Sequence, residues 1–288
     1  MMNELEISRR GIKWMMALLV AAISTFTNGA AQSQEATARP TATEIMEKSN
    51  RAFYYQGNDM KVDVTMDLLT ADRKKQSRVL TMLRRNESLG GNQKYFLYFH
   101  EPADVRRITF MVWKYPEKED DRWIYVPAVD LVRRIAASDA RSSFVGSDFT
   151  YEDISGRDVG LDTHQLLTED KVGDRDCYVV ESVPKESIGY VKRISWVDKT
   201  TFLPLKEEYY DLQKELVRMF SADKIEEVTI GEGDERKTVP TVTRRTMKNI
   251  KTGHRTEVTF TSVSYNIGLG DNIFTERYLR RPPKEAMR

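Results

Sequence analysis

The chain contains few side chains that could do nucleophilic, acid–base or metal chemistry. Its three histidines, His100, His164 and His254, lie far apart in the sequence, and no histidine or cysteine spacing matches a metal-ligand motif. Residues 146–148 place a serine beside an aspartate, but a capped turn explains this pair without a catalytic triad. Neighbouring carboxylates would point to opposite faces of a strand, which makes them poor acid–base pairs. We therefore expect no enzymatic activity, no catalytic residue, no metal site and no cofactor.

Aromatic residues indicate binding instead, because they occupy both faces of three predicted strands, 93–101, 106–115 and 121–126. A sheet with one face in solvent needs only one apolar face, so both faces of this region must be covered or must cover something. Either the chain buries both faces itself, or one face forms an apolar groove that accepts an acyl chain. The candidate ligand-binding residues in these strands are Phe96, Tyr98, Phe110, Trp113, Trp123 and Tyr125.

Arginine pairs flank the aromatic strands and could contact a charged head group. Alternation directs one residue of each pair, 106–107 and 133–134, toward the interior or the rim of the sheet. A guanidinium there could hold a phosphate or a carboxylate through paired hydrogen bonds. The candidates are Arg107, Arg133 and Arg134. The alternative is that these charges protect an edge strand from aggregation.

Two segments outside the predicted strands could cover such a groove. Thr41 and Glu44 have the spacing of a capping box, which predicts a helix over residues 41–55 with an apolar stripe. The longer segment 136–163 is irregular and carries aromatic side chains that could lie across the sheet. The residues of these two segments that we expect to contact a ligand are Ile45, Met46, Phe53, Phe144 and Phe149.

Alternation of apolar and polar side chains dominates the rest of the chain, as residues 60–68 show. The other predicted strands are 75–85, 93–101, 106–115, 121–126, 130–135, 164–171, 175–183, 189–198, 203–211, 215–229, 240–250 and 255–267. Their short connections make consecutive strands antiparallel neighbours, and none is long enough to hold a crossover helix. We therefore expect a mainly β fold, an antiparallel meander that closes into a barrel, folds into a sandwich or curls around another element.

The first 31 residues resemble a cleavable export signal. Three basic residues precede an apolar run over 14–23, and small residues follow up to Ala31, the expected cleavage site. A membrane anchor is the alternative, but the run is about half of the roughly 20 apolar residues that a spanning helix needs. Residues 8–13 weakly resemble a twin-arginine signal, so the export route stays open. The lone cysteine, Cys177, lies far from the leader and is expected to be buried and not lipid-modified.

The charge balance bounds the possible partners. The chain has 45 Lys and Arg against 44 Asp and Glu, and the leader holds three of the former and two of the latter, which leaves 42 of each. Nucleic-acid binding usually requires a basic excess, so we expect no nucleic-acid partner. One cysteine cannot form an internal disulfide, so the stability of the fold must come from its core.

Several segments resemble the outer-membrane lipoprotein-sorting proteins of the LolA-like superfamily, in their longer form. The matching segments are 122–128 (Arg-Trp-Ile-Tyr-Val-Pro-Ala), 132–135 (Val-Arg-Arg-Ile), 144–153, 196–199 (Trp-Val-Asp-Lys), 203–205 (Leu-Pro-Leu), 265–266 (Tyr-Asn) and 271–275 (Asp-Asn-Ile-Phe-Thr). Residues 146–153, Gly-Ser-Asp-Phe-Thr-Tyr-Glu-Asp, are the most specific of these. The resemblance covers residues 41–283, between a flexible segment at 32–40 and a short tail at 284–288.

The resemblance implies a half-open antiparallel β-barrel of about eleven strands with an N-terminal helix and a helical lid over its concave face. It implies a monomeric periplasmic carrier and chaperone that shelters lipid, an acylated lipoprotein or a similar amphiphile in an apolar cavity. An inner-membrane transporter of the efflux type and an outer-membrane acceptor would be its partners.

Three alternatives remain open at this stage. A periplasmic accessory subunit of a transporter would bind a protein through the aromatic strands and carry no lipid. An outer-membrane barrel would also show a leader and alternating strands, but the charged residues in 60–68 do not suit a lipid-facing belt. An unrecognised hydrolase would need an acid–base pair assembled from distant segments.

Overall fold

The computed structural model describes residues 39–231 and 236–288. The predicted leader, its cleavage site at Ala31 and nearly all of segment 32–40 lie outside the described residues. Residues 40–288 form one compact unit, which therefore includes the segment 284–288. In the part of the chain that the structure describes, no helix is both long enough and apolar enough to cross a bilayer.

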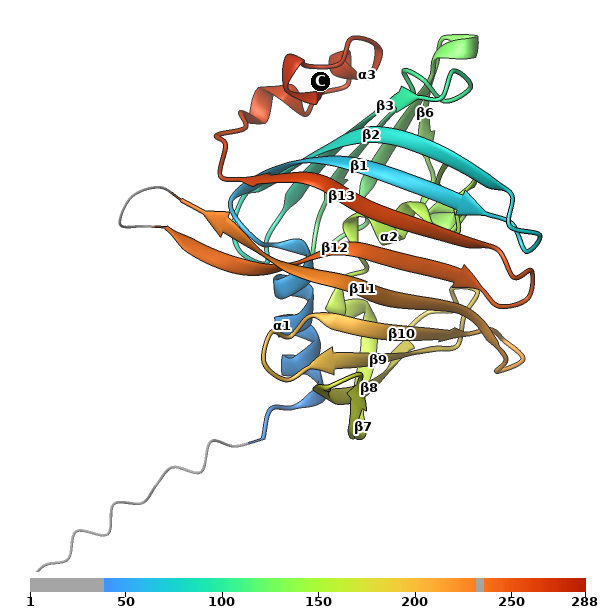
Figure 1. Cartoon of the computed structure of the whole chain (residues 1–288), viewed down its shortest axis with the longest axis vertical. Coiled ribbons are helices and arrows are strands. Elements are labelled where there is room, and N and C mark those ends of the chain that lie inside the picture. Colours follow the sequence, from blue (N-terminus) through green and yellow to red (C-terminus); the bar gives the residue numbers. More distant parts are fainter. Residues whose placement is uncertain (1–38, 232–235) are drawn as a thin grey trace, which may run out of the picture. The chain divides into compact units, whose positions relative to one another are not determined.

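Alternating side chains build a single antiparallel sheet of 13 strands (Figure 1). The strands are β1 (Asp59–Leu69), β2 (Lys75–Asn86), β3 (Gln93–Glu101), β4 (Thr109–Lys114), β5 (Asp121–Val126), β6 (Leu131–Ile135), β7 (Asp162–Val172), β8 (Arg175–Pro184), β9 (Lys192–Asp198), β10 (Pro204–Tyr210), β11 (Leu216–Ile230), β12 (Lys237–Asn249) and β13 (Arg255–Tyr265). The segments predicted from alternation correspond to these strands one by one. The number of eleven that the resemblance implied is too small for this chain.

The sheet consists of two antiparallel meanders, β1 to β6 and β7 to β13, which are joined by the pairing of β1 with β13. From one edge to the other the order is β6-β5-β4-β3-β2-β1-β13-β12-β11-β10-β9-β8-β7. The first strand thus lies at the centre, where it pairs with β2 on one side and β13 on the other. Because β6 and β7 lie at opposite edges, the residues between them must cross from one edge to the other. The sheet is open, and its two edges are not paired with each other.

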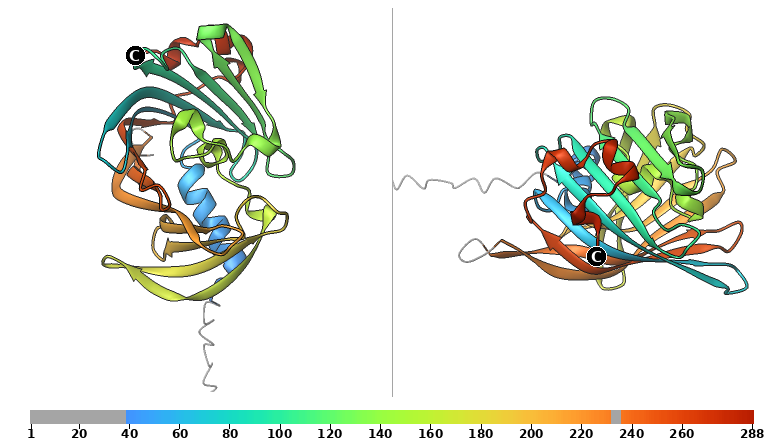
Figure 2. Two further views of the ribbon diagram at one scale, coloured as in Figure 1. Left: turned by 90° about the vertical axis from the view of Figure 1, so that its right-hand side faces the viewer. Right: turned by 90° about the horizontal axis from the view of Figure 1, so that it is seen from above.

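The crossing residues run through the hollow of the curved sheet, beside α1 (Ala42–Tyr54), as Figure 2 shows. We call residues 136–161 the crossover segment. It contains three 3-10 turns and one short helix, namely η2 (Ala137–Asp139), η3 (Phe144–Gly146), α2 (Tyr151–Ser155) and η4 (Val159–Leu161). The largest buried cluster lies on this concave side and joins the inner faces of β1 to β5 with Phe144, Phe149 and Tyr151.

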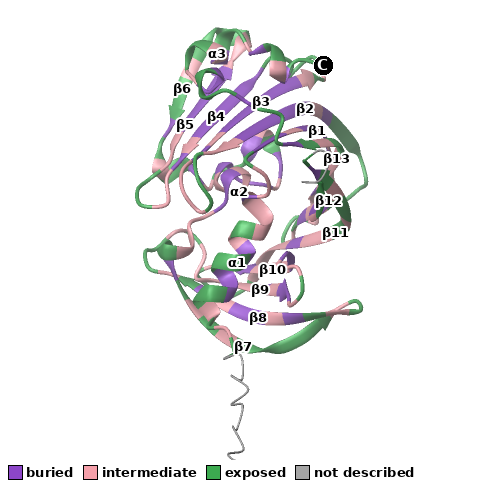
Figure 3. Ribbon diagram, turned by 90° about the vertical axis from the view of Figure 1, so that its left-hand side faces the viewer, coloured by how far each residue is buried: buried purple, intermediate pink, exposed green. Residues whose placement is uncertain are grey.

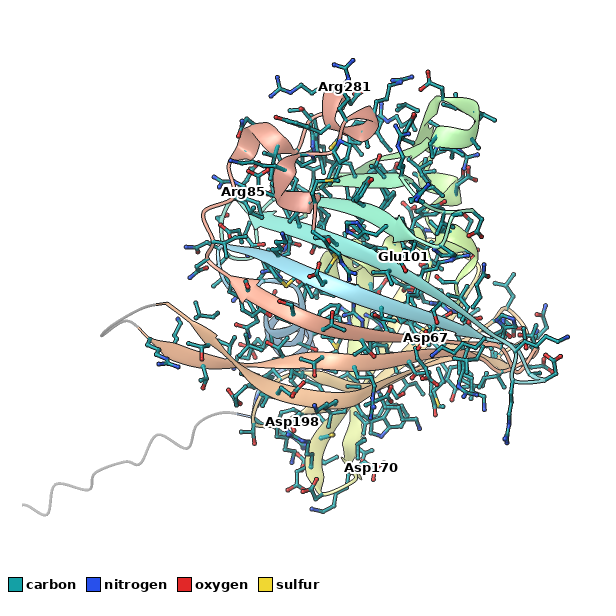
Figure 4. The ribbon with its side chains drawn as sticks, turned by 45° about the horizontal axis from the view of Figure 1, so that its top comes forward. Asp67, Arg85, Glu101, Asp170, Asp198 and Arg281 are labelled. Carbon is teal, nitrogen blue, oxygen red and sulfur yellow. The ribbon has the colours of Figure 1, made fainter. Side chains whose placement is uncertain are left out.

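The convex side of β2 to β5 is covered by the C-terminal residues, a cover that the sequence did not predict. The covering residues include η6 (Asp271–Ile273), α3 (Arg277–Arg280) and η7 (Lys284–Ala286), while η1 (Pro127–Val129) lies in the β5–β6 turn. Asp59 fixes the start of this segment, because its carboxylate accepts the backbone amides of residues 267, 268 and 269 at 2.7, 2.9 and 2.9 Å. Figure 3 shows the resulting buried stripes on β2 to β5, and in Figure 4 Arg281 points away from the sheet.

A second buried cluster fills the space between these strands and the C-terminal residues. Phe274 and Leu279 are fully buried there, as is Ala286 in the segment predicted as a short tail. The Trp113 Nε1–H donates to the carbonyl of Phe274 at 3.0 Å, and the Thr109 hydroxyl donates to that of Leu279 at 2.7 Å. Different parts of the chain therefore bury the two faces of the aromatic strands. The helix α1 and the crossover segment cover the concave face, and the C-terminal residues cover the convex face.

Candidate functional site

The concave side of the sheet is closed first by α1. The helix starts with the predicted capping box, in which Thr41 N–H donates to Glu44 Oε2 at 2.8 Å and Glu44 N–H donates to Thr41 Oγ1 at 3.2 Å. Ile45 and Met46 are buried against β8 and β9. Farther along the helix, Phe53 packs edge-on against Phe220 of β11, with ring centroids 5.9 Å apart.

The crossover segment closes the other half of the concave side with aromatic side chains. Phe144 is fully buried and lies against Phe99 and Phe110, with centroids 5.9 and 5.3 Å apart. Helix α2 begins with a capping box of Thr150 and Asp153. The Ser147 hydroxyl donates to the carbonyl of Phe144 at 2.8 Å, as expected for a turn residue.

Polar side chains of the sheet hold both elements in place. Arg78 donates to the carbonyl of Val145, and the buried Lys114 ammonium donates to that of Gly156 at 2.7 Å. Further contacts of this kind join Arg218 to Asp153, Thr256 to Asp148, and Arg84 to the carbonyls of Tyr54 and Gln56 at the end of α1. The two elements that cover the apolar inner surface are thus held to the sheet mainly by side-chain hydrogen bonds, beside their apolar packing.

Gly156 is where the two covering elements touch. Its φ is +78°, and a Cβ there would lie 2.6 Å from the ring of Tyr54 in α1. We expect Gly156→Ala to lower the free energy of unfolding by about 1–3 kcal/mol, because alanine disfavours this backbone conformation and would displace the ring. Urea unfolding followed by tryptophan fluorescence would measure the loss.

Gly173 provides the matched control for this prediction. It has a φ of +62° in the β7–β8 turn, but no atom lies within 4 Å of a Cβ placed there. Gly173→Ala should therefore show the backbone cost alone. Equal losses of unfolding free energy in both variants would mean that the close approach of Gly156 to Tyr54 adds nothing to the cost of the substitution.

Two small cavities remain between α1, the crossover segment and the sheet. The first has a volume of about 60 Å³ and is lined by α1, α2 and strands β9 to β12. Its carboxylates are paired: Glu152 with Arg157 at 3.3 Å, Glu207 with Arg193 at 3.5 Å, and Asp153 with Arg218. Burial raises the pKa of the Tyr54 and Tyr190 hydroxyls far above the usual range, so these side chains stay neutral.

The second cavity, of about 40 Å³, has a different charge. Two guanidinium groups line it, those of Arg84 and Arg245, and among the described residues no carboxylate does. Its other walls are apolar or neutral, and burial raises the pKa of Tyr95 and Tyr265 there. Burial also lowers the pKa of both arginines. Ligand pockets usually measure about 300–1,000 Å³, so neither cavity can hold an acyl chain while the two covering elements are in place.

The structure divides the predicted ligand-binding residues between the two faces of the sheet. Six of them lie on the concave side or in the elements that cover it: Ile45, Met46, Phe53, Phe110, Phe144 and Phe149. The other five belong to the convex cluster beneath the C-terminal residues: Phe96, Tyr98, Trp113, Trp123 and Tyr125. Placing these five in the same cavity was wrong, because side chains at consecutive positions of a strand point to opposite faces.

The predicted head-group arginines lie on the surface. Arg107, Arg133 and Arg134 are exposed, and none of them lines either cavity. Arg134 pairs with Asp121. The guanidinium groups of the second cavity come instead from two other arginine pairs, 84–85 and 244–245, in which alternation sends one member inward. The same signal that selected 106–107 and 133–134 could have identified them. No three His, Cys, Asp or Glu side chains of residues 39–231 and 236–288 gather in a way that could hold a metal ion.

An open antiparallel sheet that curves around helices defines the LolA-like class of folds, and comparisons with solved structures agree. A domain from Vibrio parahaemolyticus, described as an outer membrane lipoprotein-sorting protein domain, is 27% identical with a TM-score of 0.73, over 83% of this chain and 98% of that one. A DUF1329 family protein from Desulfovibrio piger is 29% identical with a TM-score of 0.72, over 82% and 97%. A LolA superfamily protein from Nitrosomonas europaea shares the fold at 23% identity, with a TM-score of 0.63 over 83% and 100%.

The family follows from the sequence match. A family model described as "Uncharacterized protein" matches residues 91–281, which is more than half of the chain. The chain therefore belongs to this family, and its structural neighbours are the lipoprotein-sorting, DUF1329 and LolA superfamily proteins. No curated protein matches the chain.

Proposed function

We propose that this protein is a periplasmic carrier, without enzymatic activity, that binds lipid, an acylated lipoprotein or a similar amphiphile. The cargo lies between the concave face of the sheet and a lid formed by α1 and the crossover segment. One observation carries the proposal: the apolar inner face of a LolA-like sheet is covered by two elements that are not strands of the sheet and are held to it by packing and side-chain hydrogen bonds.

The filled interior suits a carrier that must also release its cargo. Each buried methylene contributes about 0.8 kcal/mol, so an acyl chain alone would bind very tightly to an empty apolar cavity. Here Phe53 and Phe144 pack against that surface. Cargo must displace them, and the lost contacts offset part of the binding energy. Binding is therefore reversible in this proposal, and the lid acts as a competitor of the cargo.

The proposed partners follow from this role. An inner-membrane transporter of the efflux type would deliver the amphiphile, and an outer-membrane acceptor would receive it. The Vibrio parahaemolyticus neighbour is described as a lipoprotein-sorting domain, which supports an acylated cargo. Delivery by a monomer is sufficient, because the covering elements and the sheet belong to the same chain.

Native mass spectrometry of gently purified protein tests the proposal. We expect a population with the mass of the mature chain plus one lipid or acylated ligand, which organic extraction removes. A mass without adducts, together with a co-purifying protein partner, would instead support an accessory subunit. Incubating the extracted protein with vesicles of bacterial lipid should restore the adduct, and failure to do so would contradict the carrier role.

A further inference from the structure

The second cavity contains two positive charges that no carboxylate among the described residues of its own wall balances. Arg84 and Arg245 line it, and no carboxylate of the described residues does. Removing a guanidinium group from water is costly unless a counter-ion or hydrogen bonds compensate for the loss. Whether the cavity can bind an anion therefore depends on which groups already offset the desolvation cost of these two guanidinium groups.

Among the described residues Arg245 makes no ion pair with a carboxylate. It also lines the first cavity, but each of the three carboxylates there is paired with another arginine. The Nε atom of Arg245 is sealed from solvent and has no hydrogen-bond partner in the structure. The guanidinium lies between the rings of Phe53 and Phe260, 5.4 and 4.8 Å from their centroids. Asp153 acts on it electrostatically, but that carboxylate is bound to Arg218 and to the backbone amide of Thr150. Two aromatic rings stabilise a buried cation less than a carboxylate would.

Arg84 donates its hydrogen bonds to the lid, while Asp59 acts on it electrostatically and is itself bound to the backbone amides of residues 267–269. The two terminal nitrogens of Arg84 donate to the carbonyls of Tyr54 and Gln56, at the end of α1, and its Nε has no partner. Phe53, which covers Arg245, belongs to the same helix. Displacement of α1 would therefore remove the hydrogen-bond partners of Arg84 and one of the two rings that cover Arg245, whereas Phe260 of β13 would stay in place. An oxyanion that enters between the displaced helix and the sheet could then bind both guanidinium groups.

The surroundings of the two arginines suit the rest of an amphiphile. The cavity is about 40 Å³, and one water needs roughly 10–15 Å³ measured in this way, so it holds a group the size of a carboxylate. Met60, Met82 and Phe260 form its apolar wall, which continues into the concave cluster of β1 to β5. A head group at the arginines would thus place its chain against the surface that α1 and the crossover segment cover.

We propose that Arg245, together with Arg84, binds the oxyanion head group of an anionic amphiphile whose hydrocarbon chain lies along the concave face of the sheet. This inference rests on the proposed carrier function and adds a charge requirement for the cargo. The shared chemistry is an oxyanion on a long alkyl chain. A fatty-acid carboxylate and a lipid phosphate monoester both provide it.

Binding of three probes that share an oleyl or oleoyl chain tests this inference: oleate, oleoyl lysophosphatidic acid and oleyl alcohol. Isothermal titration of the extracted full-length mature protein should show at least one anionic probe binding about ten times more tightly than the alcohol. Whichever anion binds identifies the source of the oxyanion. Sodium phosphate without a chain is the fourth arm. It should compete only weakly, and strong competition would overturn the requirement for a chain.

The variant Arg245→Met removes the charge and keeps an unbranched side chain. It should bind the anionic probe about tenfold more weakly and oleyl alcohol as before. Its thermal midpoint should not fall, because the substitution removes a charge without a carboxylate partner. Arg245→Lys keeps the charge and should retain part of the preference for the anion. Arg244→Met is the matched control, since Arg244 is the exposed neighbour on the same strand.

The outcomes separate this inference from the carrier function. If wild-type protein binds the alcohol and the anions equally well, and Arg245→Met changes neither, the head-group site is refuted while the carrier function stands. If no oleyl or oleoyl probe binds, the carrier function fails and the inference fails with it. If Arg244→Met has the same effect as Arg245→Met, the preference arises from the overall charge and not from the cavity.

Discussion

A disulfide between positions 148 and 256 should abolish uptake of acyl-chain ligands. The Asp148 backbone N–H donates to Thr256 Oγ1 at 2.9 Å, and that hydroxyl donates to Asp148 Oδ2 at 2.7 Å. Cysteines at both positions would place two sulfurs within bonding reach and fix the crossover segment to β13. The apparent affinity is proportional to the fraction of molecules in which the crossover segment has moved off the concave face. If the disulfide keeps this fraction below about 1%, binding should weaken about a hundredfold.

The chain is well suited to this experiment. Its one cysteine, Cys177, is buried, and burial raises the pKa of its thiol to about 11, so it should not compete for oxidation at neutral pH. Uptake of a fluorescent fatty acid is the measurement, and reduction with dithiothreitol should restore it. Asp148→Cys and Thr256→Cys alone control for the lost hydrogen bonds. Equal uptake by the oxidised and reduced double variant would show that the crossover segment is not part of the lid.

Replacing Phe274 by alanine should cost about 3–5 kcal/mol of stability. This side chain is fully buried between the C-terminal residues and the convex face of β2 to β5, among Phe96, Met111 and Trp123. The expected cost has two parts: the loss of the favourable free energy of burying the ring, and the cost of the cavity that the smaller side chain leaves. For a domain with a total stability of about 5–15 kcal/mol, this is a large fraction. Urea unfolding should show a lower midpoint.

Met287→Ala serves as the control, because Met287 belongs to the same segment and is 43% exposed. Its effect should stay within about 0.5 kcal/mol. A small effect of Phe274→Ala would mean that the C-terminal residues do not contribute to the core. The slope of the unfolding curve should be unchanged in both variants, since it reflects the surface that unfolding exposes.

Local patterns predicted the elements of the fold well. Alternation in residues 60–68 and in the other predicted segments identified the 13 strands, and the spacing of Thr41 and Glu44 identified α1 with its cap. Alternation also separated Phe96 and Tyr98 from Phe99 correctly, on opposite faces of β3. It could not say which face belongs to the interior. That depends on the C-terminal residues, which accept hydrogen bonds from β4 across 161 and 170 positions of the chain.

The candidate site was predictable only in part. The covering elements were predicted with their residues Ile45, Phe53, Phe144 and Phe149, because apolar side chains outside the strands must be buried somewhere. The arginines that face the interior were not. Arg84 of β2 and Arg245 of β12 are 161 positions apart in the sequence, and they meet only because β1 pairs with β2 and β13, and β13 pairs with β12.

The sequence by itself determined what short-range physics controls: strand alternation, helix capping, turns and the apolar character of both sheet faces. The tertiary structure alone decided which strands lie at the edges, where the crossover segment runs, what covers the convex face and which charges share a cavity. Those features depend on contacts between distant segments, and residues far apart in the chain carry no local signal of the partner that they will meet.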